Sequence, residues 1–296
     1  MKKTHTFLFI IFFISIFCHA KIKTSLSLSP HIGFTFGQFD EILYAPDETM
    51  CSLLEWEQKP LLNLGLSANL ELNNFSIISS FEYGTKIANP QMYDSDWSDG
   101  IKYSYTIHPL ESSREINTQF KIAYNIFPHH SISLFPEIEI KYIYASFNAG
   151  RGAGIRNDRQ IKVYGVDYTR HSLFFFTGLK FSKNLNSFTT IDTDFMVAPY
   201  IYQYAIDFHH GVNNPFTSIE IQNGFFSKFK INTTLSFKCT NNFTIDLYTN
   251  FLFGRETKGS FYSNYYTEEI TKFTDQQTGS KIFSAKFGIA TTFKIF

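Results

Sequence analysis

Hydrophobic and polar residues alternate along much of this 296-residue chain. In segment 62–72 the even positions carry leucine or alanine, and the odd positions carry Asn, Gly, Ser or Glu. Segments 136–142, 200–209 and 243–254 repeat the pattern. Because successive side chains of a strand point to opposite faces, a period of two predicts strands with one apolar and one polar face.

A membrane crossing by this chain would have to use such strands. After residue 20 no apolar run reaches the roughly 20 residues that a membrane-spanning helix needs. The sequence holds 35 Phe and 17 Tyr but only 9 Pro, which favours strands. A soluble periplasmic all-β domain could also alternate, so the pattern leaves that alternative open.

The spacing of the polar breaks favours a barrel. Short breaks lie near 73–74, 128–130, 183–186 and 240–242, and long polar segments lie near 45–52, 87–108, 148–162, 209–217 and 255–279. Four short turns alternating with five long loops imply about ten strands, with both chain ends on the short-turn side. We therefore expect an all-β fold, a transmembrane antiparallel β-barrel with long extracellular loops and short periplasmic turns.

Residues 1–20 have the pattern of a secretory signal peptide. Two lysines precede an apolar stretch from 7 to 18, and a cleavage site follows at Ala20. The alternative is a lipoprotein anchored through Cys18, but the bulky Phe17 before it is unsuited to that signal. Residues 21–296 contain no internal repeat or linker, so we expect a single β-barrel domain.

The remaining composition argues against two further features. Removing residues 1–20 takes away two basic residues and no acidic one, so the mature chain is slightly acidic and bulk nucleic-acid binding gains no support. Cys51 and Cys239 belong to opposite ends of the expected barrel, which argues against a disulfide.

Two clusters of titratable residues lie where an expected strand meets a long loop. Continuing the strand phase from Phe81 turns Asp94 and Asp96 into the lumen together, and the same reasoning turns Asp207 and His209 inward. A carboxylate beside an imidazole can orient the ring and raise its basicity, while a carboxylate pair can bind a water and help to deprotonate it. Taken singly, each cluster is more often a solvated edge or an adventitious cation site. Segment 192–194 has the same Asp-x-Asp spacing but follows a short turn, so we expect it only to line the lumen.

Both clusters resemble motifs of the omptins, a family of outer-membrane endoproteases. Met92-Tyr93-Asp94-Ser95-Asp96-Trp97 resembles the family's Met-x-Asp-x-Asp-Trp segment, and Asp207-Phe208-His209 resembles its Asp-x-His. The resemblance extends over the mature chain through its length, its loop order and the terminal Phe296.

The resemblance implies an aspartic-type hydrolase, a surface endopeptidase that cuts polypeptides near basic residues. It implies that His209 is the general base, Asp207 its orienting partner, Asp94 the carboxylate that holds the water, and Asp96 a supporting group. It places the active site on the extracellular side of the cell outer membrane, and it implies no covalent intermediate and no metal.

The resemblance also implies substrate contacts by Glu41 and Met92, with Glu41 receiving the basic side chain before the cut. Two positions depart from the family. Ala205 stands where the family has a further acid that grips this side chain, and Ser104, in Tyr103-Ser104-Tyr105, occupies the loop where another acid selects the residue after the cut. Specificity after the cut is therefore open.

No cofactor is expected. Omptins bind lipopolysaccharide through charged side chains on a strand that resembles 140–147, but those positions here carry Tyr and Ile, so the lipid site is not recognisable. Arg151, Arg156 and Arg159 could contact anionic headgroups, although a solvated basic loop is the simpler reading. Outer-membrane lipid and polypeptides at the cell surface are the expected partners.

Two other functions stay open. A barrel of the same descent could act without catalysis, as an adhesin or receptor. A passive porin fits less well, because about ten strands leave a lumen largely filled by side chains and wide aqueous channels use about 16 or more.

Overall fold

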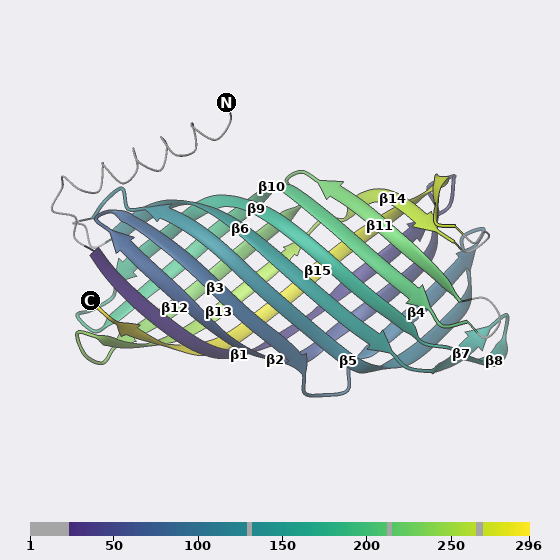
Figure 1. Cartoon of the computed structure of the whole chain (residues 1–296), viewed down its shortest axis with the longest axis horizontal. Coiled ribbons are helices and arrows are strands. Elements are labelled where there is room, and N and C mark those ends of the chain that lie inside the picture. The colour runs from purple at the N-terminus through teal and green to yellow at the C-terminus, as the bar shows by residue number, and fades with distance from the viewer. Residues whose placement is uncertain (1–23, 129–131, 212–214, 265–268) are drawn as a thin grey trace, which may run out of the picture.

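The alternating segments form a closed antiparallel barrel (Figure 1). The computed structural model describes residues 24–128, 132–211, 215–264 and 269–296. Within these ranges the chain has no helix with the length and apolar character needed to cross a bilayer. The expected signal peptide, residues 1–20, lies outside the described residues and stays a prediction.

Strand segments make up most of the described chain. Their bounds are β1 (Thr24–Tyr44), β2 (Met50–Leu72), β3 (Phe75–Lys86), β4 (Gln91–Ser98), β5 (Ile101–Tyr124), β6 (Ile132–Ala149), β7 (Gly152–Arg156), β8 (Arg159–Val163), β9 (Val166–Asn184), β10 (Thr189–His209), β11 (Phe216–Gly224), β12 (Lys228–Lys238), β13 (Phe243–Gly254), β14 (Thr257–Ser263) and β15 (Thr271–Lys294).

The segments assemble into ten antiparallel strands, as the sequence predicts. One complete ring runs β1, β2, β3, β5, β6, β9, β10, β12, β13 and β15, and the pairing of β15 with β1 closes it. Farther along the barrel β4 takes the place of β3 between β2 and β5. In the same way β11 and β14 fill the space between β10 and β15.

The long polar segments are more ordered than the expected loops. Segments 87–108 and 148–162 continue largely as strands, β4 with the start of β5 and β7 with β8. Backbone groups outside the lipid can still be paired by extending the ladder, which is why polar sequence does not interrupt it. Asn157 and Asp158, with φ of 48° and 61°, make the tight turn between β7 and β8. We call this end the ribbon end; the start of β1 and the end of β15 lie at the other (Figure 1).

A belt of apolar side chains covers the outer wall. Leu64 and Leu66 on β2 and Ile138 and Ile140 on β6 are exposed, while their polar neighbours, such as Asn63, are buried inside. The predicted faces of segments 62–72 and 136–142 are therefore confirmed. Such a belt is what lipid tails require of a barrel wall.

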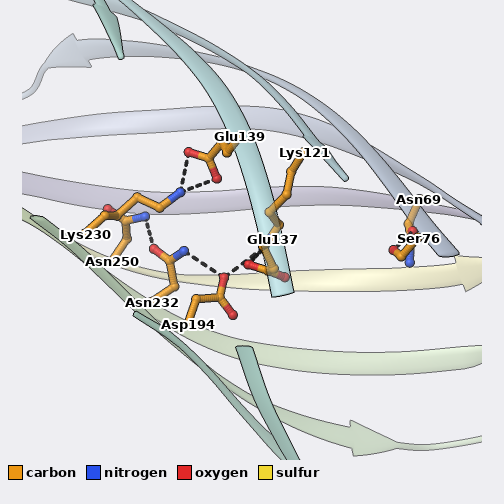
Figure 2. Close-up of polar contacts among 9 residues, drawn as sticks. All are labelled: Asn69, Ser76, Lys121, Glu137, Glu139, Asp194, Lys230, Asn232 and Asn250. Carbon is orange, nitrogen blue, oxygen red and sulfur yellow. Dashed lines mark hydrogen bonds and ion pairs between the residues drawn. The ribbon is translucent and has the colours of Figure 1, made fainter. Parts of the chain in front are cut away.

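Charged side chains cross the lumen inside this belt (Figure 2). Lys230 of β12 contacts both carboxylate oxygens of Glu139 on β6, and both side chains are fully buried. Lys121 of β5 lies 2.8 Å from Asp194 on β10 and 3.2 Å from Glu137 on β6. Asp194 thus lines the lumen, as expected for the Asp-x-Asp near a short turn.

A second pair spans the lumen between strands that are not neighbours. Lys286 of β15 contacts Glu82 on β3, and His31 Nε2 lies 3.4 Å from the other oxygen of that carboxylate. Because these pairs cross the lumen, polar side chains occupy the interior of the barrel. This occupation argues against a wide aqueous channel.

The Lys230–Glu139 pair predicts a measurable stability effect. Replacing Lys230 by Met leaves the Glu139 carboxylate buried without its cation, which should lower the free energy of unfolding by about 3 kcal/mol or more. The midpoint of urea unfolding in detergent micelles measures this change. Lys238→Met, at an exposed position of β12, should have almost no effect.

A double variant separates the lost pair from lost packing. Lys230→Met with Glu139→Gln removes the unpaired charge and should regain part of the lost stability. If the single variant is as stable as the unmodified chain, the pair does not stabilise the lumen in this way.

Candidate active site

Asp207 and His209 end β10 at the ribbon end, beyond Tyr202, the last exposed aromatic residue of that strand. Their side chains both turn inward, and His209 Nε2 lies 2.6 Å from Asp207 Oδ2. An ionised carboxylate only accepts hydrogen bonds, so Nε2 carries the proton and donates it, which leaves Nδ1 as the basic nitrogen. The ring of Phe216 stacks on the imidazole at 4.1 Å, and Ser218 Oγ donates to the same Asp207 oxygen at 3.3 Å. The imidazole is thereby held in one orientation.

The neighbouring histidine has a different partner. His210 Nε2 contacts Asp167 Oδ2 of β9 at 2.9 Å, and its ring meets Phe208 edge-on. The strand phase therefore continues to the end of β10, and His209 is the histidine that joins Asp207.

Asp94 and Asp96 lie on β4, which runs between β2 and β5. Asp96 is opposite Ser52 on one side and Ser104 on the other, so a serine flanks it on each neighbouring strand. Both aspartates are half-buried. The inward direction that the alternation in β3 predicts for Asp94 and Asp96 is therefore kept in β4, although residues 87–90 interrupt the strand.

The two pairs lie close enough to affect each other's pKa. Burial raises the pKa of Asp94 to about 7; the charge of Asp96 adds to this and that of His209 opposes it. Burial also raises the pKa of Asp96. Burial lowers the pKa of His209, but the charge and hydrogen bond of Asp207, with the charges of Asp94 and Asp96, outweigh it and leave this pKa raised. The structure thus brings the four expected catalytic residues to one mouth, and the pKa of about 7 for Asp94 suits a role in proton transfer.

Arg156 is a site residue that the sequence analysis missed. It lies on β7, opposite Ser104 of β5, with its Nη2 4.0 Å from Asp96 Oδ2 and its Nε donating to Ser104 Oγ at 3.4 Å. Arg156 is exposed, as the interpretation of this segment as solvated implies, but it lies on a strand rather than a loop and reaches Asp96. Arg151, by contrast, lies over the ring of Tyr164. The register between β5 and β7 brings Arg156 to the site, and no local motif indicates it.

The two expected substrate-contact residues lie farther inside the mouth. Glu41 of β1 is 6% exposed, and burial, with the charges of Asp207 and Glu220, raises its pKa well above the usual value. It lies two residues from Phe39, whose strand partner on β2 is Trp56. Met92 of β4 is fully buried opposite Trp56, which stacks on Tyr168 at 4.9 Å. Glu41 therefore borders an aromatic wall, and Met92 packs within that wall.

Two buried charged residues flank the position where an acid was expected. Ala205 pairs with Arg170 of β9 on one side and with Glu220 of β11 on the other. Glu220 was missed, although it alternates with Ile219 and Ile221 as an inward residue should. Arg170 and Glu220 are each 1% exposed.

Comparison with solved structures gives a close fold match. The outer membrane protease OmpT from Escherichia coli superposes with a TM-score of 0.80 over 92% of this chain and 97% of that chain, at 14% identity. The P. putida toluene transporter TodX, at 8% identity over 91% of this chain and 90% of that one, reaches a TM-score of only 0.32. No curated protein matches the sequence.

The comparison with family models covers most of the chain. The model of the Omptin family matches residues 22–294, which includes all fifteen strand segments. Together with the transmembrane barrel fold, this match supports a function of the outer-membrane protease kind. On the extent of the family match, the chain belongs to the omptin family.

Proposed function

We propose that this chain is an outer-membrane endopeptidase of the aspartic type that activates a water between an Asp-Asp pair and a His-Asp pair. The observation that carries the proposal is the meeting of Asp94 and Asp96 with Asp207 and His209 at one mouth, although the pairs come from distant strands. Four titratable groups that gather at one rim and influence each other's pKa are suited to water activation.

In the proposed reaction His209 is the general base. Its Nδ1 takes a proton from the water while Asp207 holds Nε2–H, and the ionised Asp94 carboxylate binds the same water. The hydroxide attacks the peptide carbonyl, and the imidazolium then gives its proton to the departing amine. Asp96, flanked by Ser52 and Ser104 on the neighbouring strands, supports Asp94. Protons balance without a covalent enzyme intermediate.

We further propose that the substrate is a polypeptide reaching the ribbon end from the extracellular side, cut after a basic residue. The buried Glu41 carboxylate favours Arg or Lys through a charge-assisted hydrogen bond, beside the wall that Met92 helps to form. The start of β1 and the end of β15 lie at the other end of the barrel from this mouth, which supports a mouth on the extracellular side (Figure 1).

The second candidate function is a non-catalytic adhesin or receptor that binds a protein at the same mouth. Ala205 and Ser104, the two positions without the family's acids, favour it. The two candidates differ in their response to loss of the base, because binding needs no proton transfer.

Loss of the base or of the water-binding carboxylate should abolish cleavage. With quenched-fluorescence peptides that contain Arg or Lys, we expect His209→Ala and Asp94→Asn each to lower kcat/KM by at least about a hundredfold, as befits general-base chemistry. Asp192→Asn, from the Asp-x-Asp outside the mouth, is the matched control and should retain activity. Heat-modifiable migration on a gel verifies folding. A folded barrel that cuts no peptide, with or without added lipopolysaccharide, would favour the receptor.

The pH profile should follow the charges around Asp94. Catalysis needs Asp94 ionised and His209 neutral, so kcat/KM should fall as the pH drops through about 7, where Asp94 takes up a proton. Asp96→Asn removes a negative charge that raises the pKa of both groups, so the acid limb of the remaining activity should move to lower pH.

Arg156 should have the opposite effect. Its positive charge lowers the pKa of Asp94 and Asp96, so Arg156→Ala should move the acid limb to higher pH. Arg159→Ala, on the same hairpin, is the control and should leave the profile unchanged. Shifts of the two test variants in the same direction would contradict this account of the site.

A further inference from the structure

The mouth contains a second charged layer, below the catalytic pairs, on three adjacent strands. Arg170, Ala205 and Glu220 are aligned across β9, β10 and β11, and all three are almost completely buried. Inward positions aligned across a ladder lie side by side. The methyl group of Ala205 therefore separates two long charged side chains at the place where the family resemblance implies an acid.

Glu220 of β11 and Glu41 of β1 come together although their strands are not neighbours. Gln222 Nε2 donates to Glu220 at 2.8 Å and to Thr278 Oγ1 at 3.1 Å, and the Thr278 hydroxyl donates to the carbonyl of Ile42, next to Glu41. The charge of Glu220 also raises the pKa of Glu41. The two side chains are buried, with exposed fractions of 6% for Glu41 and 1% for Glu220. Buried carboxylates near each other disfavour each other's ionisation, and a cation placed between them relieves that cost.

Arg170 balances only part of this charge. Its Nη2 donates to Gln222 Oε1 at 3.2 Å, and Gln222 Nε2 donates to Glu220 at 2.8 Å, so the glutamine separates the guanidinium from the carboxylate. The guanidinium also lies over the Phe39 ring, 5.7 Å from its centre. With both glutamates ionised, and Asp207 nearby, the single positive charge of Arg170 leaves an excess of negative charge that a cationic ligand would offset.

Several buried polar atoms here have no partner within the described part of the chain. They are Glu41 Oε2, the Tyr168 hydroxyl, and Nε and Nη1 of Arg170. Each of these side chains is more than nine-tenths buried. Of these atoms, Glu41 Oε2 and the Tyr168 oxygen can accept hydrogen bonds from a cationic side chain, whereas the Arg170 N–H groups can only donate.

From this geometry we propose that Glu220 is the second carboxylate of the primary specificity pocket, where it and Glu41 together bind the basic side chain that precedes the cut. It supplies from β11 the acid that position 205 lacks on β10. One Lys or Arg neutralises the remaining charge. A guanidinium can also bridge two carboxylates through parallel N–H groups, so Arg is preferred to Lys. The inference rests on the proposed endopeptidase and specifies its substrate.

The test compares peptides that differ only in the residue before the cut, which is Arg, Lys or norleucine. Glu220→Gln should lower kcat/KM for the Arg peptide by about tenfold to a hundredfold, mainly through KM, because a charge-assisted bond is lost. Cleavage of the norleucine peptide should change by less than about twofold. Glu48→Gln, an exposed acid in the β1–β2 hairpin, is the matched control and should change neither value.

A second variant tests whether the acid can move between strands. Ala205→Asp combined with Glu220→Ala places the carboxylate on β10 in the same layer, and it should restore much of the preference for Arg. This variant also decides the question if Glu220→Gln fails to fold.

The outcomes separate the two levels of the proposal. If the folded, unmodified barrel cuts none of the peptides, the proposed function fails and this inference with it. If the barrel cuts peptides but Glu220→Gln keeps the full preference for Arg, only the inference is overturned. An equal loss on all three peptides by a folded Glu220→Gln barrel, with no recovery in the exchange variant, also overturns it.

Discussion

Closure of the barrel is the constraint on which the rest of this structure depends. Lipid offers no partner to backbone N–H and C=O groups, so every strand must be paired on both sides, and the pairing of β15 with β1 completes the ring. Closure and alternation together send every second side chain into a narrow interior. That interior must hold charged residues, and burial obliges them to find partners across the lumen, as Lys230 does with Glu139.

The same geometry produces the candidate active site where the wall rises beyond the apolar belt. There the strands continue as paired ribbons. Inward charged side chains at this level are not restricted to a layer in which each charge is neutralised by a partner across the lumen. Asp207 and His209 keep the phase of β10, and Asp94 and Asp96 keep the phase of β3 through β4. Burial and like charge then bring Asp94 to a pKa of about 7, which a solvated aspartate would not have.

Sequence predicts well whatever depends on one strand at a time. The ten strands and the inward face expected for Asp207 and His209 follow from period-two phase and turn spacing. The choice of His209 over His210 does not, because a bulge would shift the phase, and only the structure shows which histidine joins Asp207. Sequence also fails where contacts depend on register between strands. Arg156 reaches Asp96 only because β7 pairs with β5, and polar composition alone does not distinguish a ribbon such as β7–β8 from a loop.

Register also changes how a missing motif residue should be judged. In a barrel, inward positions on adjacent strands converge on the same volume, so a functional group can change strands without leaving its site. Ala205 is a loss when β10 is read alone, but its ladder partner Glu220 carries a carboxylate into the same layer and to Glu41. Sites in related barrels should therefore be compared by the inward side chains of one layer across neighbouring strands, not by one strand alone. Compared in this way, the mouth of this barrel retains a pair of acids, Glu41 and Glu220.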